Sequence, residues 1–316
     1  MKESIKFTIA LPAYKIQYLE ECITSITNQD YENWELIILN DQSPYNLDKV
    51  IEPYLKDSRI KYHENKKKCG ARNLVNNWNK CLELSTGDYF ICIGDDDMLT
   101  AESLTTYSKY IKMYPNIPVV HGRTAIIDDN NHIIDIQTKK PIHQSLFEEM
   151  LVLYKGDRQF IGDWCFRTKE LKKNGGFYYE PYAWTSDHIT VFQLAINHGI
   201  INTQEIVFLY RENDHSITNN TSISKEKVLI MNDFEKCIHN FLNRPAKDTN
   251  DLAVKEILTK ETGNYIMKLK AYLMAQSIAS NIWFIFHWTR NRKLYKITSS
   301  HIIRSLLLGI KIKLKK

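Results

Sequence analysis

The first 120 residues alternate short, β-rich apolar runs with stretches of helical periodicity. The strand-like runs are 5–12, 34–40, 59–63, 88–94 and 117–122, and the helical stretches between them are 18–29, 47–55, 71–84 and 101–114. This alternation is typical of βαβ units, in which successive strands lie parallel and helices cover the sheet. The sequence therefore predicts an α/β fold with a mostly parallel sheet flanked by helices.

Beyond residue 120 the pattern is less regular. Residues 122–137 have the alternation and the Asp-Asp-Asn-Asn turn of a hairpin, 187–197 the pattern of a helix and 205–211 that of a strand. From about residue 224 the pattern is helical to the end. We therefore expect one domain over residues 1–222, with halves 1–120 and 121–222, and a helical C-terminal extension over 223–316.

Charge divides the chain in a similar way. The net charge is +5, but no Asp or Glu follows Glu261, and residues 262–316 hold eleven Lys or Arg. The remainder carries a net charge of −6. A mildly acidic body with a basic tail indicates a polyanionic partner of the tail, such as phospholipid or nucleic acid.

The cysteines and the N-terminus indicate a cytoplasmic protein. Six cysteines include no Cys-x-x-Cys pair, which favours a reduced compartment over a disulfide framework. The apolar run that ends at Pro12 is too short for a signal peptide, and polar residues interrupt the longest apolar region, 271–288. We expect no leader and no spanning helix.

Polar loops follow three of the predicted strands: Pro12-Ala13-Tyr14, residues 40–43 and residues 94–97. In open α/β sheets, ligands bind where the loops at the carboxyl ends of the strands converge. Asp41 alone is more typical of a turn or a helix cap. A turn or a cap does not explain three consecutive acids, Asp95, Asp96 and Asp97. Adjacent carboxylates repel one another unless a cation or a proton intervenes. A hard divalent ion such as Mg²⁺ or Mn²⁺ would explain them.

Three longer stretches resemble a known family: "TIALPAYKIQYLEECITSITNQDYENWELIILNDQS", "CGARNLVNNWNKCLELSTGDYFICIGDDDML" and "NGGFYYEPYAWTSDHITVFQLAINHG", the last followed by "LYRENDHSIT". Their order resembles the inverting nucleotide-sugar transferases of glycosyltransferase family 2, which have the GT-A fold. The resemblance covers roughly residues 5–218. It implies a catalytic domain over 1–222, with a nucleotide-sugar half (1–120) and an acceptor half (121–222).

The resemblance also implies which residues bind the donor. Pro12, Ala13 and Tyr14 would line the nucleotide-base pocket, and Asp41 would accept a hydrogen bond from the imide N–H of uracil. Arg72 would hold the nucleotide side of the donor, although a surface salt bridge is its alternative role. These positions imply a UDP-sugar donor.

The acidic motif departs from the family pattern Asp-x-Asp-Asp, because Gly94 replaces the first acid. We expect Asp96 to be the main ligand of Mn²⁺ or Mg²⁺ and Asp95 to support the ribose or a metal-bound water. Asp97 would cap the helix that begins near Thr100. His215 matches a histidine that approaches the metal or the diphosphate in relatives.

In the acceptor half, Asp187 aligns with the general base, which takes the proton of the attacking hydroxyl. Ser186 replaces the usual Glu, and either residue could instead cap a helix. An aromatic-rich region surrounds this motif and could serve as a sugar platform or as core. Its members are Trp164, Tyr178, Tyr179, Tyr182 and Trp184.

The C-terminal segment "HIIRSLLLGIKIKLKK" places Ile303, Leu306, Leu307 and Ile310 at helical spacing, with Arg304, Lys311 and Lys315 on another face. Aromatic residues at 283–288 precede it. This pattern predicts an interfacial helix on an anionic membrane; the alternative is a helix packed on the body. We expect a peripheral protein at the inner face of the cytoplasmic membrane that extends a glycan or a lipid-linked saccharide for a bacterial surface polysaccharide.

Two other functions remain alternatives. A nucleotidyltransferase would need a Gly-rich phosphate loop after the first strand, and "LPAYKIQ" contains no glycine. A non-catalytic polyanion-binding protein that takes nucleic acid would need interleaved basic and aromatic residues. The tail instead segregates apolar from basic residues, so we expect no nucleic-acid partner.

Overall fold

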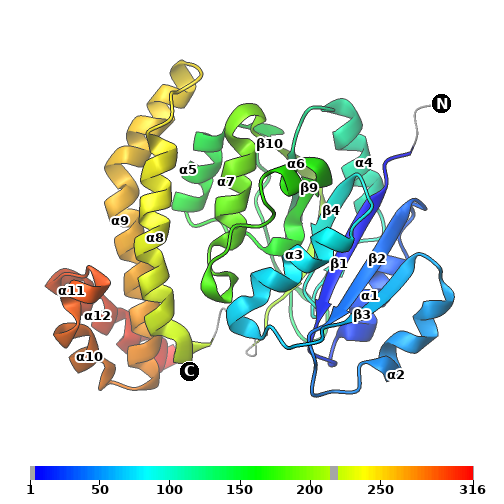
Figure 1. The fold of residues 1–316 in the computed structure, drawn as a ribbon. Coiled ribbons are helices and arrows are strands. Elements are labelled where there is room, and N and C mark those ends of the chain that lie inside the picture. The colour runs from blue at the N-terminus through cyan, green and yellow to red at the C-terminus, as the bar shows by residue number, and fades with distance from the viewer. Residues whose placement is uncertain (1–3, 214–219, 316) are drawn as a thin grey trace. The chain divides into compact units, whose positions relative to one another are not determined.

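The computed structural model describes residues 4–213 and 220–315 and divides into two compact units. The N-terminal unit is Met1–Asn213 and the C-terminal unit is Asp214–Lys316. Figure 1 shows the sheet in the N-terminal unit and a bundle of helices in the C-terminal unit.

A mixed sheet forms the centre of the N-terminal unit. Within the described residues its main strand order is β3-β2-β1-β4-β9-β6-β10-β5, with β7 beside β6 and β8 beside β10. The strands are β1 (Phe7–Ala13), β2 (Trp34–Asn40), β3 (Ile60–Glu64), β4 (Tyr89–Cys92), β5 (Met98–Leu99), β6 (Val119–Ile127), β7 (Ile133–Ile136), β8 (His143–Gln144), β9 (Trp164–Arg167) and β10 (Ile200–Arg211). The α/β class predicted from the sequence is confirmed.

Parallel strand pairs occur both within the regularly alternating part of the sequence and beyond it. Strands β3, β2, β1 and β4 pair in parallel, whereas β9 lies antiparallel between β4 and β6. Strands β6 and β7 form the expected hairpin. Strand β10 also pairs in parallel with β6, so the sheet is mixed and its parallel pairs are not confined to the part where strand and helix alternate regularly.

Helices cover the sheet with their apolar sides. They are α1 (Leu19–Thr27), α2 (Asp48–Ile51), α3 (Leu74–Leu84), α4 (Ser103–Met113), α5 (Leu146–Tyr154), α6 (Thr168–Lys173) and α7 (Ser186–His198), with the short 3₁₀ helices η1 (Glu52–Lys56), η2 (Ala71–Asn73), η3 (Ile161–Asp163) and η4 (Pro181–Ala183). Helix α1 buries Leu19, Cys22, Ile23 and Ile26, which recur at the spacing of one helix face. They join β1 and β2 in one hydrophobic core.

The C-terminal unit is helical, as its sequence pattern predicts. It consists of η5 (Thr221–Ile223), α8 (Ser224–Leu242), α9 (Thr249–Ser280), α10 (Phe284–Arg290), α11 (Arg292–Tyr295) and α12 (Ser299–Lys315). Figure 1 shows α8 and α9 side by side, with α10, α11 and α12 gathered at one end of the pair. Within residues 4–213 and 220–315, no helix combines the length and the apolar content needed to span a bilayer.

Candidate active site at the carboxyl edge of the sheet

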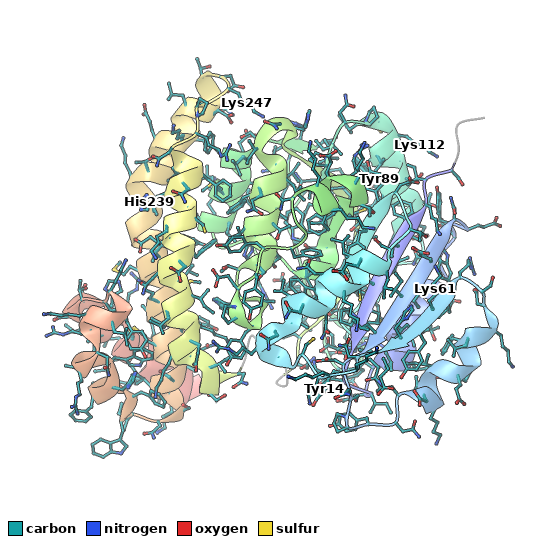
Figure 2. The ribbon with its side chains drawn as sticks, viewed as in Figure 1. Tyr14, Lys61, Tyr89, Lys112, His239 and Lys247 are labelled. Carbon is teal, nitrogen blue, oxygen red and sulfur yellow. The ribbon has the colours of Figure 1, made fainter. Side chains whose placement is uncertain are left out.

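The loops that follow β1, β2 and β4 leave the sheet side by side. Ala13 pairs with Asn40 across β1 and β2, and the Ile93 N–H donates to the Ala10 carbonyl at 2.9 Å. Figure 2 shows Tyr14, which follows β1, at the opposite end of the sheet from Tyr89, the first residue of β4. The polar loops identified in the sequence therefore share one edge, as the parallel pairing requires.

Asp95 ties the first and fourth strands together. Its Oδ2 accepts the backbone N–H groups of Tyr14 at 2.7 Å and Lys15 at 2.6 Å. Burial of this carboxyl, together with the neighbouring charge of Asp96, raises the pKa of Asp95 to about 6. The observed role of Asp95 is thus to position the loop after β1 against the acidic loop.

Asp96 is the least buried of the three acids, with 14% of its side chain exposed. Its Oδ2 accepts hydrogen bonds from the Lys15 ammonium at 2.6 Å and from the Asn213 amide at 2.7 Å. A cation and a neutral donor therefore share one carboxylate oxygen. This pair joins the loop after β1 to the residues that follow β10.

Asp97 is not a helix cap, contrary to the expectation from sequence. Helix α4 begins at Ser103, and no side-chain hydrogen bond caps it. The Asp97 carboxylate instead accepts the backbone N–H of Arg211 at 2.9 Å. Burial raises the pKa of Asp97 well above its ordinary value. The capping prediction fails because the chain forms β5 before it turns into the helix.

Arg211 is a structural residue of this edge that the sequence reasoning missed. Its guanidinium is buried and donates to the Asp96 carbonyl at 2.9 Å, the Asp128 carbonyl at 3.0 Å and the Glu21 carboxylate at 2.9 Å. It also lies over the ring of Tyr18. The only feature of the sequence that could have indicated this role is the position of an arginine at the end of the apolar run 205–211. The side chain thus holds the acidic loop in shape from a strand 114 positions further along the chain.

Gly94 gives the acidic loop its close packing. A Cβ atom at this position would lie 2.8 Å from Asp97 Oδ2 and 3.1 Å from Asp96 Oδ1. Both approaches are tighter than ordinary carbon–oxygen contacts. In this loop conformation a side chain at position 94 would require the carboxylates of Asp96 and Asp97 to shift.

Asp41 shapes the loop that leads to Arg72. Its Oδ1 accepts the Cys69 N–H at 2.7 Å and the Asn65 amide at 2.8 Å, and its Oδ2 accepts the Gly70 N–H at 2.8 Å. The Cys69 thiol lies beside the same carboxylate, which is buried. Asp41 is at least an anchor of this loop.

Tyr14 and Arg72 each contact a neighbour at this edge. The Lys68 ammonium donates to the Tyr14 hydroxyl at 2.6 Å and lies 4.3 Å from the centre of its ring. The Arg72 guanidinium lies 5.7 Å from the centre of the Tyr182 ring. Pro12 and Ala13 end β1 directly before Tyr14. The three residues predicted to line the base pocket therefore all lie at the carboxyl end of β1.

Asp187 follows a strained turn. Tyr182, Ala183 and Thr185 all have positive φ angles, 62°, 54° and 70°, which non-glycine residues rarely adopt. Thr185 is the N-cap residue of α7, so neither Ser186 nor Asp187 has that position. The Asp187 carboxylate remains 14% exposed and accepts the backbone N–H of His188 at 2.9 Å. The turn holds this acid at the helix start.

The two halves of the N-terminal unit meet beside this turn. The Tyr179 hydroxyl donates to Asn73 Oδ1 at 2.8 Å, next to the contact of Arg72 with Tyr182. Trp164, in contrast, is fully buried in β9 and belongs to the core. The aromatic region is thus divided: Trp164 is core, and Tyr179 and Tyr182 border η2.

A divalent cation is compatible with the acids at this edge. Mg²⁺ is commonly held by one or two carboxylates together with substrate phosphates, and Asp96 supplies one partly exposed carboxylate. Within residues 4–213 and 220–315, no group of three or more His, Cys, Asp and Glu side chains has the geometry of a complete metal site. His215 lies outside the described residues.

Comparison with known proteins places the sequence in a family. The sequence model of the family described as "Glycosyl transferase family 2" matches residues 8–174. CgeD of Bacillus subtilis is 29% identical over 133 residues, which are 40% of this chain and 30% of CgeD. WfgD of Escherichia coli, a UDP-Glc:alpha-D-GlcNAc-diphosphoundecaprenol beta-1,3-glucosyltransferase, is 31% identical over 129 residues, 39% of this chain and 47% of WfgD. The chain thus spans about a third to a half of these two relatives.

Solved structures share the fold at low sequence identity. S. aureus TarS 1-349 in complex with UDP-GlcNAc has a TM-score of 0.66 and 14% identity, over 99% of this chain and 93% of TarS 1-349. The mannosyltransferase PcManGT of Pyrobaculum calidifontis, in complex with GDP-Man and Mn²⁺, has a TM-score of 0.57 and 14% identity, over 99% and 88%. At these identities the likeness establishes the fold.

Proposed function

The chain belongs to glycosyl transferase family 2, and we propose that it transfers a sugar from a UDP-sugar to an acceptor hydroxyl with inversion at the anomeric carbon. The observation that carries this proposal is the junction of the two halves. Arg72 and Asn73 of the donor side contact Tyr182 and Tyr179, which lead into Asp187. These contacts support a site at which the proposed donor side and the proposed acceptor side meet. The family match favours this reaction over nucleotidyl transfer and over a non-catalytic role.

The donor would lie across the loops after β1, β2 and β4. Pro12, Ala13 and Tyr14 would border the base, and Asp41 would accept the uracil imide N–H. Arg72 would contact the nucleotide. UDP appears in the names of both WfgD and the TarS complex, which supports the choice of a UDP-sugar.

Asp96 would hold a divalent cation, Mn²⁺ or Mg²⁺, between the protein and the diphosphate. Such an ion neutralises the charge that develops on a departing nucleotide. The Mn²⁺ complex of PcManGT supports this choice of cofactor class. Asp95 would act by positioning the loop after β1, and His215 is proposed as a further ligand.

Asp187 is proposed as the general base. The acceptor oxygen attacks the anomeric carbon while the bond from that carbon to the diphosphate oxygen breaks, and the hydroxyl proton passes to the Asp187 carboxylate. UDP leaves from the opposite face. The backbone N–H of His188 orients the carboxylate, and the strained turn before α7 places it.

We further propose that the acceptor is a glycan on a lipid carrier, in the synthesis of a bacterial surface polysaccharide, at the inner face of the cytoplasmic membrane. WfgD is named for such an acceptor, a diphosphoundecaprenol-linked sugar. Helix α12 has two opposed faces that fit attachment to a membrane surface. Ser305 and Gly309 are buried, and a Cβ on Gly309 would lie 3.1 Å from the Ala275 carbonyl, so this face packs on α9.

The other face of α12 is apolar and exposed. Ile303, Leu307, Ile310 and Leu314 are 60%, 64%, 46% and 82% exposed. At 100° per residue they fall within an arc of about 60°. Arg304 and Lys311 lie on one flank of this stripe and Lys313 on the other. An apolar stripe between basic flanks fits an interface with anionic lipid.

Helix α10 repeats this division of faces. Trp288 is buried, whereas Trp283 and Phe286 are 69% and 65% exposed and stack on each other with ring centres 5.5 Å apart. Exposed tryptophan and phenylalanine beside basic residues suit the headgroup region of a bilayer. Helix α10 therefore adds exposed aromatic side chains to the apolar surface proposed for α12.

A donor screen tests the proposed reaction. Full-length protein is incubated with UDP-, GDP- and dTDP-sugars, an undecaprenyl-diphosphate-linked acceptor and MnCl₂, and nucleotide release is measured. We expect release of UDP alone, its loss with EDTA and its recovery with added Mn²⁺. Release of only GDP or dTDP would contradict the donor assignment, and turnover that persists in EDTA would contradict the metal assignment.

A further inference from the structure

Lys15 contacts the acidic loop of residues 95–97 in two ways. Its own backbone N–H donates to Asp95 at 2.6 Å, and its ammonium pairs with Asp96 at 2.6 Å. One residue therefore contacts two of the three acids, through its main chain and its side chain. The backbone bond fixes where the side chain starts, and the flexible four-carbon stem leaves the ammonium free to move.

The ammonium of Lys15 also occupies one of the two carboxylate oxygens of Asp96, Oδ2. Asp96 Oδ2 already accepts from Lys15 and, at 2.7 Å, from Asn213. Divalent cations of this class bind carboxylate oxygens at about 2.0–2.1 Å. A divalent ion at that distance from Oδ2 would lie close to the ammonium and would be repelled by it. The two cations therefore compete for this oxygen.

Neighbouring cations do not replace Lys15 in this role. Arg211 is buried, and its guanidinium donates to two backbone carbonyls and to Glu21. The ammonium of Lys68 is engaged with Tyr14. In the described part of the chain, Lys15 is the cation whose side chain forms an ion pair with the acidic loop.

We propose that Lys15 is an exchangeable counter-ion: it neutralises Asp96 in the nucleotide-free protein and moves to the diphosphate of the donor when a divalent cation takes its place on Asp96. This inference rests on the proposed function and adds a positioning residue to it. Two consequences follow. Lys15 weakens cation binding to the protein alone, and it strengthens nucleotide binding once the cation is bound. Cation and nucleotide therefore favour each other, and by linkage the effect is reciprocal.

The test uses full-length protein with MnCl₂ and UDP as probes, by isothermal titration calorimetry. We expect Lys15→Met to raise the affinity for Mn²⁺ without UDP, and to lower the affinity for UDP at saturating Mn²⁺, each by roughly tenfold, within the ordinary range of coupling between sites. Lys15→Gln should behave alike. Lys15→Arg keeps the charge and should leave the affinity for Mn²⁺ low.

The matched control is Lys112→Met, an exposed lysine near the end of α4. Figure 2 shows it at the opposite end of the N-terminal unit from Tyr14. We expect this variant to bind both probes as the wild type does. A general change in surface charge would move both variants in parallel and would overturn the inference.

Opposite changes in the two affinities distinguish the proposal from a structural role. If Lys15→Met weakens both, or leaves the affinity for Mn²⁺ unchanged, Lys15 is not an exchangeable counter-ion. If the wild type binds neither Mn²⁺ nor UDP, the proposed function itself fails. Thermal melting of each variant, compared with the wild type, shows whether a loss of binding reflects a loss of folding.

Discussion

Arg211 and Leu314 mark the difference between the two units. Arg211 carries a full charge inside the N-terminal unit, and Leu314 leaves an apolar side chain 82% exposed on the C-terminal unit. Both depart from the usual separation of polar and apolar groups in folded proteins. Arg211 is a buried charge, whereas Leu314 is an exposed apolar side chain. The two differ in whether other residues of the same unit contact and compensate the side chain.

The buried charges of the N-terminal unit have partners from the same unit. Arg211 is bound by two carbonyls and a carboxylate, and Asp95 accepts two backbone N–H groups. Burying a charge costs several kcal/mol unless it is paired and hydrogen-bonded, so these contacts offset the cost. The apolar stripe of α12 has no comparable cover in the described residues of its own unit. The N-terminal unit therefore compensates its buried charges internally, whereas the C-terminal unit leaves an apolar stripe exposed.

Asp187 gives the largest expected effect, because it is the proposed base and its carboxylate is partly exposed at the junction of the two halves. Asp187→Asn keeps the size and the hydrogen bond from His188 but removes the base. We expect kcat to fall by about 10³-fold, within the range for loss of a general base, with the affinity for UDP unchanged. Steady-state UDP release and calorimetry measure the two quantities. Asp233→Asn, on the surface of α8, is the control. Normal turnover by Asp187→Asn would remove this residue from the mechanism.

Glu35 tests whether the N-terminal unit depends on its buried charges. Burial favours the neutral acid, but hydrogen bonds from Lys61, Thr8 and Thr86 outweigh it and lower the pKa of Glu35 to about 2. The pKa is therefore lower in the folded than in the unfolded protein. The resulting stabilisation is complete above pH of about 4.5 and is lost as the pH falls toward about 2.

We expect this contribution to be about 3 kcal/mol at neutral pH, and Glu35→Gln to remove it. Urea unfolding of the wild type and the variant, followed by tryptophan fluorescence between pH 7 and pH 3, measures it. The difference between the two proteins should shrink as the pH falls. A difference that stays constant with pH would show that the charge of Glu35 contributes nothing.

Leu307 gives the smallest expected effect and tests the surface of the C-terminal unit. Leu307→Gln should lower partitioning onto vesicles of phosphatidylglycerol and phosphatidylcholine by about tenfold, because removing one inserted leucine forfeits about 1.5 kcal/mol. Sedimentation with vesicles measures the bound fraction. Leu252→Gln changes an exposed leucine at the start of α9 and should bind as the wild type does. Equal binding by both variants, or no binding by the wild type, would show that the stripe of α12 does not meet lipid.

The elements of the fold were largely predictable because their signals are local. The apolar run at 34–40 forms β2 over the predicted residues, and the helical pattern at 101–114 forms α4 over Ser103–Met113. The carboxyl-edge loops could also be predicted, since parallel strands deliver their ends to one edge. Proximity of Tyr14, Asp41 and Asp95 followed from that topology alone.

The division of roles within the site was decided by the tertiary structure. Arg211 lies 114 positions from Asp97, and Lys15 lies 81 positions from Asp96. No local pattern links such pairs, because hydrogen bonds between distant loops depend on strand order and on the path of each loop. The close packing around Gly94 is likewise visible only in the tertiary structure. The same holds for which face of α12 packs on α9. Periodicity in the sequence determined which residues share a strand or a helix, whereas only packing decided which acids became anchors and which apolar face stayed exposed.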